Sequence, residues 1–330
     1  MTLNRRGVLG ATVVAGLAAA PRPTPAMTPV SQISPPDPTV VIRLWPGLAP
    51  GGERVTVTPR VVERSTDPAF HDRFAQYTAE PILTVLRPDH PNGASLLLIP
   101  GGGYKWAVVD KEGLDCARVF AAAGVTCFVL RYRLPGDGWT AGPDAPLQDA
   151  QRAMRLVRSR AAAHGLDPGR IAVLGASAGG HVAGLLTARA DATYAAVDEA
   201  DAVSHRPDLS ILLYPVATMA DPHVHAGSRL ELLGPEPTPE AVERYSLERM
   251  DWTGRPPTFL LHAIDVPAVP VENSLQLLSA LRAAGVPCEE HLFEEGGHGF
   301  GIRLIAGKPA AVWPQLALAW AARRGWITQT

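Results

Sequence analysis

Short apolar runs alternate with amphipathic stretches along most of the chain. The apolar runs are bounded by Pro, Gly or polar residues, which is typical of strands. They cover residues 40–45, 54–63, 82–87, 95–99, 125–132, 171–174, 209–214, 258–262 and 289–293. The intervening stretches predict helices, since apolar residues recur three and four positions apart in the clearest of them. These stretches are 111–123, 146–164, 178–189, 271–284 and 309–323. The alternation predicts an α/β fold, with a mostly parallel central sheet and helices on both faces.

One segment, 217–255, breaks this rhythm. It is rich in Pro, Glu and His and is longer than a simple connection. We expect an insertion beside the functional site that acts as a partial lid. A surface excursion without a role in catalysis is the alternative.

The N-terminus predicts an export signal. Arg5 and Arg6 precede a weakly apolar stretch at 8–20, and Pro-rich sequence follows. This order of a charged, an apolar and a small-residue region is typical of signal peptides, and the paired arginines resemble a twin-arginine signal. We expect a signal at 1–26, a linker at 27–40 and one domain at 41–330, with cleavage after Ala20 or Ala26. The expected location is periplasmic or secreted; an uncleaved disordered tail is the alternative.

Composition narrows the function classes. The 330 residues are 46% hydrophobic and 19% charged with a net charge of −2, so a large core is available. No Lys/Arg cluster with interleaved aromatic residues occurs, which argues against a nucleic-acid partner. The apolar N-terminal stretch is too short for stable membrane insertion. Oligomeric state is left open.

Neither a metal nor an organic cofactor is expected. The cysteines and several histidines fit no recognised ligand spacing. They are Cys116, Cys127, Cys288, His181, His223, His225 and His262.

The most informative motif is Gly175-Ala176-Ser177-Ala178-Gly179. It follows the apolar run at 171–174 and precedes a helix-compatible stretch. A Gly-x-Ser-x-Gly sequence between a strand and a helix is typical of a nucleophile elbow, a strained turn that exposes the serine hydroxyl. Ser177 is therefore the candidate nucleophile.

A serine nucleophile needs a base, and a third group to orient that base. His298 lies in the glycine-rich loop 296–299, after the last predicted strand. Glycines on both sides allow the loop to carry an imidazole over a neighbouring strand. His298 is the candidate base, with an ordinary structural histidine as the alternative.

The candidate acid is Asp265, just past the strand at 258–262. This position agrees with the chain order Ser, acid, His of such folds. A turn or capping role for Asp265 is the alternative, and Glu272 is the nearest substitute. Three other carboxylates fit less well: Asp201, Asp208 and Asp221.

The glycine run Pro100-Gly101-Gly102-Gly103-Tyr104 follows the strand at 95–99. Backbone N–H groups of Gly102, Gly103 and Ala178 would form an oxyanion hole. A phosphate-binding loop is the competing interpretation, but neither Gly-x-Gly-x-x-Gly nor Gly-Lys-Ser/Thr is present.

Together these motifs resemble the α/β-hydrolases, and most closely the hormone-sensitive-lipase-like and acetylxylan-esterase-like esterases. The resemblance runs from about residue 41 to the C-terminus. Its stretches are Leu44-Trp45-Pro46-Gly47, Pro100 to Tyr104, Lys111-Glu112-Gly113, Tyr132-Arg133-Leu134-Pro135, Pro146 to Ala153, Gly175 to His181, Val269 to Ser274 and Gly296 to Gly301.

The chain departs from the resembling esterases at two positions. The wider lipase group has His where this chain has Pro100. The acid loop of the resembling esterases usually carries two adjacent acids, of which the second belongs to the triad. That second position is Val266 here, so either the loop shifts by one residue or Asp265 is a neighbour of the true acid.

The resemblance implies an exported serine esterase with a Ser177–His298–Asp265 triad. Its substrate would be a small-molecule or carbohydrate ester, with acetyl groups on a polysaccharide such as xylan expected. A peptidase, lactonase or general carboxylesterase is the second hypothesis. The third is a degenerate hydrolase that binds carbohydrate without cleaving it, suggested by Val266.

Overall fold

The computed structural model describes residues 37–327. The predicted signal at 1–26, and the linker up to residue 36, lie outside the described residues.

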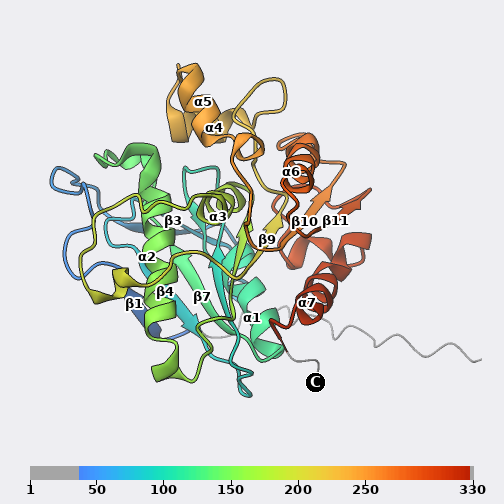
Figure 1. The fold of residues 1–330 in the computed structure, drawn as a ribbon, viewed down its shortest axis with the longest axis horizontal. Coiled ribbons are helices and arrows are strands. Elements are labelled where there is room, and N and C mark those ends of the chain that lie inside the picture. Colours follow the sequence, from blue (N-terminus) through green and yellow to red (C-terminus); the bar gives the residue numbers. More distant parts are fainter. Residues whose placement is uncertain (1–36, 328–330) are drawn as a thin grey trace, which may run out of the picture. The chain divides into compact units, whose positions relative to one another are not determined.

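An eight-stranded sheet forms the centre of the described chain (Figure 1). Its spatial order is β1 (Val40–Arg43), β4 (Ile82–Leu86), β7 (Thr126–Arg131), β5 (Ser95–Ile99), β8 (Ile171–Ala176), β9 (Leu209–Leu213), β10 (Thr258–Ala263) and β11 (Cys288–Phe293). The pairs β1–β4 and β4–β7 are antiparallel, whereas the neighbours from β7 to β11 are parallel. The predicted α/β fold with a mostly parallel sheet is confirmed.

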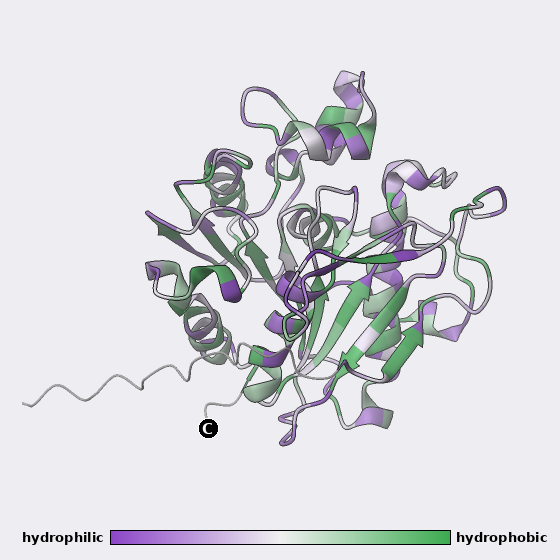
Figure 2. Cartoon of the chain, turned by 180° about the vertical axis from the view of Figure 1, so that it is seen from behind, coloured by the Kyte–Doolittle hydropathy of each residue, from purple (hydrophilic) through white to green (hydrophobic). Residues whose placement is uncertain are grey.

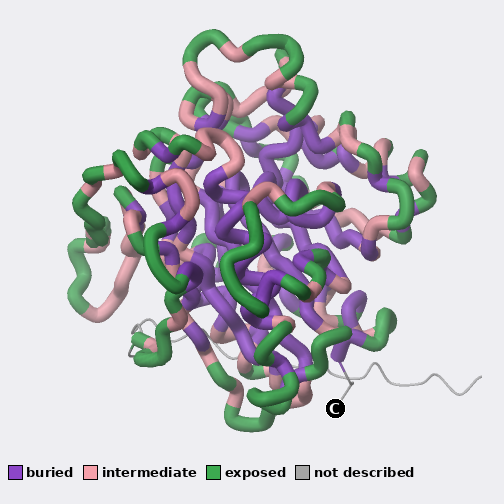
Figure 3. The backbone as a smooth tube through the Cα atoms, turned by 60° about the vertical axis from the view of Figure 1, so that its left-hand side comes forward, coloured by how far each residue is buried: buried purple, intermediate pink, exposed green. Residues whose placement is uncertain are grey.

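Helices cover both faces of this sheet because its central strands are apolar on both sides (Figure 2). Side chains at alternate positions point to opposite faces, so Leu97 and Ile99 belong to one core and Leu96 and Leu98 to the other. The first core is closed by α2 (Ala145–Ser159), α3 (Ala178–Ala188) and α6 (Glu272–Ala283). The second is closed by α1 (Asp115–Ala122) and α7 (Trp313–Arg323). Figure 3 shows the buried strands inside a shell of exposed loops.

In the first half of the chain, two predicted elements differ from those in the structure. The strand expected at 54–63 is ordered only as β2 (Arg60–Glu63), which pairs with β3 (Arg73–Gln76) and β6 (Ala107–Val108) in a second sheet of three strands. The helix expected at 111–123 begins as a π-helical turn, η1 (Asp110–Leu114), and continues as α1. The short 3₁₀ turns are η2 (Pro135–Asp137), η3 (Gly142–Asp144), η4 (Ala162–His164), η5 (Glu199–Ala202), η6 (Leu247–Arg249), η7 (Arg303–Ile305) and η8 (Pro309–Val312).

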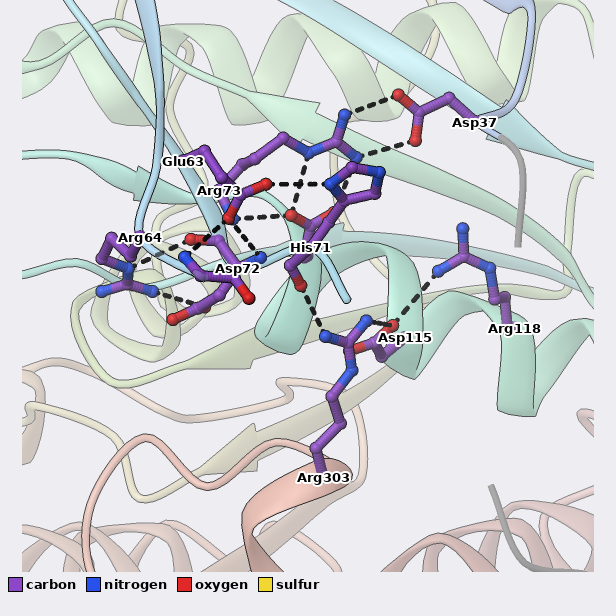
Figure 4. A network of polar contacts seen from close by, with 11 residues as sticks. Asp37, Glu63, Arg64, His71, Asp72, Arg73, Asp115, Arg118 and Arg303 are labelled. Carbon is purple, nitrogen blue, oxygen red and sulfur yellow. Dashed lines mark hydrogen bonds and ion pairs between the residues drawn. The ribbon is translucent and has the colours of Figure 1, made fainter. Parts of the chain in front are cut away.

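A polar network ties the second sheet to the rest of the fold (Figure 4). Arg73, on β3, pairs with Asp37 at 2.6 Å and with Asp110 of η1 at 2.8 Å. Arg303 donates to the backbone oxygen of His71 at 2.5 Å and to Asp115 at 2.7 Å. The network therefore joins the second sheet to η1, to α1 and to the segment that follows His298.

The segment 217–255 contains two short helices, α4 (Ala226–Leu233) and α5 (Pro239–Tyr245). His225 caps α4, because its ring accepts the N–H of Ser228. Thr238 caps α5, because its side chain accepts the N–H of Ala241. Among the described residues, no helix has both the length and the apolar character needed to cross a bilayer.

Candidate active site

Ser177 occupies a strained turn between β8 and α3. Its backbone has φ 54° and ψ −121°, a conformation that L-residues rarely adopt. The neighbouring glycine is required for space, because a Cβ on Gly179 would lie 2.0 Å from the carbonyl oxygen of Ile99. The strain and the close approach are those of a nucleophile elbow.

His298 meets this elbow from the loop after β11. Its Nε2 atom lies 2.8 Å from Ser177 Oγ, although 121 residues separate the two in sequence. The imidazole packs edge-on against the ring of Tyr214, with ring centroids 5.1 Å apart. Tyr214 follows β9 directly, so the ends of β8, β9 and β11 converge on one point. The structure thus brings the predicted nucleophile and base into hydrogen-bond contact.

The ring of His298 is held in its neutral form. Burial lowers its pKa to about 3, and nearby His262, His225 and Lys111 add to the effect. Its Nδ1 atom is buried and has no hydrogen-bond partner among the described residues. For Nε2 to accept the serine proton, Nδ1 must carry the ring hydrogen. Within the described part of the chain that hydrogen has no acceptor, so an imidazolium here would have no carboxylate hydrogen-bonded to Nδ1.

A pH profile follows from this environment. Only the neutral imidazole can accept a proton, and its pKa falls from 6.5 to about 3. We therefore expect kcat/KM for an aryl acetate to stay near its plateau at pH 5, where an unshifted histidine would be mostly protonated. The unfolded chain binds a proton that the folded chain lacks between these pH values, so stability also falls as pH drops through 6.5. Circular dichroism at each pH separates the two effects, and an acid limb centred near pH 6.5 with intact fold would contradict the expectation.

Asp265 lies under the histidine loop rather than against the imidazole. Its carboxylate accepts the backbone N–H of Gly297 at 2.8 Å and that of Gly296 at 3.1 Å. These hydrogen bonds, led by the one from Gly297, lower the pKa of Asp265. The side chain is exposed, whereas Val266 beside it is 4% exposed. The expected contact between Asp265 and the His298 ring is absent from the hydrogen bonds of the described residues.

The other carboxylates considered from sequence are engaged elsewhere. Glu272, at the start of α6, lies 3.8 Å from His223 Nδ1. The remaining three each pair with an arginine: Asp201 with Arg152, Asp208 with Arg158 and Asp221 with Arg229.

The glycine loop after β5 presents its N–H groups on one side. The carbonyl of Gly101 accepts from Val108 N–H, and that of Gly102 accepts from Lys105 and Trp106 N–H. In a trans peptide the N–H points away from the carbonyl, so the N–H groups of Gly102 and Gly103 face the opposite side. Gly102 has φ +131°, and a Cβ there would lie 2.2 Å from the Trp106 oxygen.

Ala178 is the first residue of α3, where a backbone N–H has no acceptor within the helix. Its N–H thus joins those of the glycine loop as a donor available for an oxyanion.

Ser177, His298, Gly102 and Gly103 line one pocket of about 440 Å³. The insertion contributes its other wall through His225 and three residues of α4: Gly227, Leu230 and Glu231. The segment expected to be a partial lid therefore borders the site. No group of three or more His, Cys, Asp or Glu side chains within residues 37–327 could hold a metal ion.

A family model described as the alpha/beta hydrolase fold matches residues 96–302, which is more than half of the chain. The chain belongs to this family. Its elbow, glycine loop and histidine loop all lie within the matched residues.

Two relatives of this alpha/beta hydrolase are similar over about two thirds of its length. Endo-1,4-beta-xylanase B of Butyrivibrio fibrisolvens is 34% identical over 221 residues, 67% of this chain and 34% of that protein. An acetylxylan esterase of Xylanibacter ruminicola is 32% identical over 221 residues, 65% of this chain and 42% of that protein. The chain thus spans about a third to two fifths of these curated relatives.

A solved structure gives broader coverage. The acetyl ester-xyloside bifunctional hydrolase of Caldicellulosiruptor lactoaceticus is 33% identical with a TM-score of 0.70. The match covers 88% of this chain and 98% of that one. The resemblance to acetylxylan-esterase-like α/β-hydrolases predicted from the motifs is therefore confirmed.

Sequence reasoning missed three buried polar residues around the site. Glu112 and Tyr214 hydrogen-bond to each other between the glycine loop and the histidine loop. His262 accepts from or donates to Ser274 Oγ at 2.8 Å and donates to the Val269 oxygen at 3.0 Å, which braces the loop after β10. The sequence offered one signal for Glu112, its place in Lys111-Glu112-Gly113, one of the stretches that resemble the esterases.

Proposed function

We propose that this alpha/beta hydrolase is an exported serine esterase that hydrolyses short-chain acyl esters. Acetyl esters on a polysaccharide or oligosaccharide such as xylan are the proposed substrates. The observation that carries the proposal is the 2.8 Å contact between Ser177 Oγ and His298 Nε2, at a strained elbow beside the glycine loop. The names of the relatives, an acetylxylan esterase and an acetyl ester-xyloside hydrolase, support the substrate class. Export rests on the twin-arginine-like sequence at 1–26 alone.

The proposed reaction has two steps. Ser177 Oγ bonds to the ester carbonyl carbon while its proton passes to His298 Nε2, and the carbonyl oxygen becomes an oxyanion. The N–H groups of Gly102, Gly103 and Ala178 stabilise that oxyanion. Collapse of the intermediate breaks the bond to the alcohol oxygen, which takes the proton from Nε2. Water, deprotonated by His298, then bonds to the acyl carbon. Collapse breaks the bond to Ser177 Oγ, which takes the proton back from Nε2, and the acid is released.

In this proposal Asp265 acts through the backbone of the histidine loop. Its carboxylate holds the N–H groups of Gly296 and Gly297, one and two residues before the base. A base must lie within hydrogen-bond reach, about 2.6–3.2 Å, of the atom whose proton it accepts, and a misplacement of about 1 Å can cost about 10²-fold in rate. Fixing two successive peptides limits how far the imidazole can swing away from Ser177.

We expect Asp265→Ala to lower kcat by about 10- to 100-fold, the effect of a base that is displaced but present. The acid limb of the pH profile should stay where the wild type has it, because the carboxylate does not contact the ring. Stopped-flow or pH-stat assays of both proteins measure this. A loss of about 10⁴-fold together with a shifted pKa would instead identify Asp265 as the direct partner of the imidazole.

Val266→Asp tests the converse of Asp265→Ala, because it adds a carboxylate to the acid loop instead of removing one. It restores a carboxylate at the position where the resembling esterases carry their triad acid. An anion beside the ring raises the pKa of His298, so the acid limb should move to higher pH and kcat should increase.

One observation favours a second candidate, a carbohydrate-binding protein that does not turn over. It is the Nδ1 atom of His298, which has no hydrogen-bond partner among the residues described, so no carboxylate would hydrogen-bond to an imidazolium there.

A substrate panel tests the proposal against this alternative. Acetate release from acetylated xylo-oligosaccharide, compared with turnover of an aryl acetate, a dipeptide and a lactone, identifies the bond that is cleaved. Acetate release from the oligosaccharide is expected. Binding without release of any product would favour the second candidate, and preferential cleavage of the dipeptide or lactone would overturn the substrate class.

A further inference from the structure

Glu112 is a buried carboxyl group that the proposed reaction does not use. It lies in the π-helical turn η1 and is 2% exposed. Burial raises its pKa, against the lowering effect of the neighbouring Lys111. A π-turn is rare and is found mostly where a fold must aim a side chain, often at functional sites. A buried carboxyl is costly unless its oxygens are hydrogen-bonded.

Both oxygens of Glu112 are in use, and each connects to a different loop of the site. Oε2 accepts the backbone N–H of Gly101 at 2.9 Å, and Oε1 accepts the hydroxyl of Tyr214 at 3.1 Å. The Tyr214 oxygen in turn accepts the N–H of Gly301 at 3.1 Å. Gly101 directly precedes the oxyanion glycines, and Gly301 lies three residues after His298. A continuous chain of hydrogen bonds therefore links the glycine loop to the histidine loop.

The space around the Glu112 carboxyl group is filled by neighbouring atoms. A Cβ on Gly101 would lie 2.8 Å from Glu112 Oε2 and 2.8 Å from Ser177 Cβ. On the other side, a Cβ on Gly299 would lie 3.3 Å from Glu112 Oε1. The carboxyl group thus fills the space between the nucleophile turn and the histidine loop, so neither can shift without disturbing it.

Tyr214 extends the same constraint to the base. Its backbone has φ 36°, an unusual value for a non-glycine residue, and its N–H is tied to the Leu261 oxygen at 2.6 Å. The strained backbone places the ring against the imidazole of His298 and the hydroxyl on Glu112. Strain of this kind persists only where the surrounding contacts enforce it.

We propose that Glu112 is a positioning residue that fixes the oxyanion donors and the catalytic base relative to each other. The inference rests on the proposed esterase function. Oxyanion donors stabilise the transition state only if they point to the place where negative charge develops. That stabilisation is lost when the donors are displaced. Glu112 holds the Pro100–Gly101 peptide just before the oxyanion glycines and, through Tyr214, the Phe300–Gly301 peptide after the base. Its effect should therefore fall on the transition state and not on substrate binding.

The experiment compares Glu112→Leu with Glu112→Gln. Leucine removes both hydrogen bonds and should lower kcat by about 10²- to 10³-fold, as the loss of an oxyanion donor does, with KM changed by less than about threefold because ground-state binding is untouched. Glutamine keeps the shape, one acceptor and one donor, and should recover most of the lost kcat.

A transition-state analogue supplies a readout that general destabilisation would not move. Inhibition by an aryl trifluoromethyl ketone should weaken in Glu112→Leu in proportion to kcat/KM, because the adduct places an oxyanion in the hole. Glu290→Gln is the control, since Glu290 is a half-buried carboxyl on β11 whose Oε1 has no hydrogen-bond partner within residues 37–327. It should leave kcat and inhibition unchanged.

Tyr214→Phe is the second variant, used if Glu112→Leu does not fold. It removes the hydroxyl that joins Glu112 to Gly301 but retains the ring on His298, and kcat should fall with KM unchanged. Wild-type kcat and wild-type inhibition in folded Glu112→Leu or Tyr214→Phe would overturn the inference. An equal loss in Glu112→Gln and Glu112→Leu, without weaker inhibition, would also overturn it. Absence of esterase activity in the wild type would contradict the proposed function instead.

Discussion

Replacing Ser177 with alanine is expected to lower kcat for ester hydrolysis by about 10⁶-fold, the effect of removing the nucleophile of a serine hydrolase. The elbow turn should survive, because alanine differs from serine only by the hydroxyl and occupies the same strained backbone conformation. Neither the fold nor KM for an aryl acetate has a reason to change strongly. Steady-state kinetics on purified protein, with circular dichroism to confirm folding, measure the effect.

The matched control is Ser95→Ala on β5. The Ser95 hydroxyl is also buried, and it has no hydrogen-bond partner among the described residues. Its removal should leave kcat unchanged. Retention of more than about one hundredth of wild-type kcat in Ser177→Ala would show that catalysis proceeds without this hydroxyl, since losses of a triad nucleophile are far larger.

His298→Ala should produce a loss of similar size, about 10⁶-fold in kcat, because a serine hydroxyl attacks poorly without a base at Nε2 distance. Residues that act as one unit are not additive. The double variant with Ser177→Ala and His298→Ala should therefore be no slower than either single variant. Kinetics of all three variants on one substrate give this comparison directly.

The matched control for His298 is His291→Ala. His291 lies on β11, where it contacts Glu289 at 2.9 Å and has no part in the proposed reaction. Unchanged turnover in this variant would show that the loss in His298→Ala is specific. A double variant much slower than either single one would contradict a shared step for Ser177 and His298.

The contact between Ser177 and His298 could be predicted because the local sequence around each residue indicates its backbone conformation. Gly179 is needed because a Cβ there would collide with the end of β5, and Gly175 because a Cβ there would collide with Gly179 and Ala183 of α3. Glycines around His298 free the loop that carries the ring. The strand periodicity places each loop at the carboxyl end of a parallel strand. Such signals lie within a few residues of the functional side chain, so a single chain reveals them.

The partners of these residues could not be predicted, since they depend on contacts across the fold. Asp265 lies at the expected point of the chain, but its carboxylate meets peptides 31 and 32 residues away instead of the imidazole. Glu112 and Tyr214 are 102 residues apart, and nothing in either stretch announces the other. The π-turn that places Glu112 contains one apolar side chain, Leu114, so no apolar spacing distinguishes it from the start of α1.

The second sheet was missed for a related reason. Its strand β3 has only four residues, and three of them are half-buried while only Ala75 is buried, so exposure does not alternate along it. Ion pairs of Arg73 with Asp37 and Asp110 stabilise it, and such pairs leave no periodic pattern in sequence. The central parallel strands β5, β8, β9 and β10 agree with the prediction because their apolar runs are buried on both faces.

Covalent labelling at the elbow tests the central claim most directly. Wild-type protein is treated with a fluorophosphonate, and intact mass followed by peptide mapping locates the adduct. We expect one adduct, on Ser177, with none in Ser177→Ala and a strongly slowed reaction in His298→Ala. Equal labelling of the wild type and Ser177→Ala would contradict the assignment of Ser177 as the activated nucleophile.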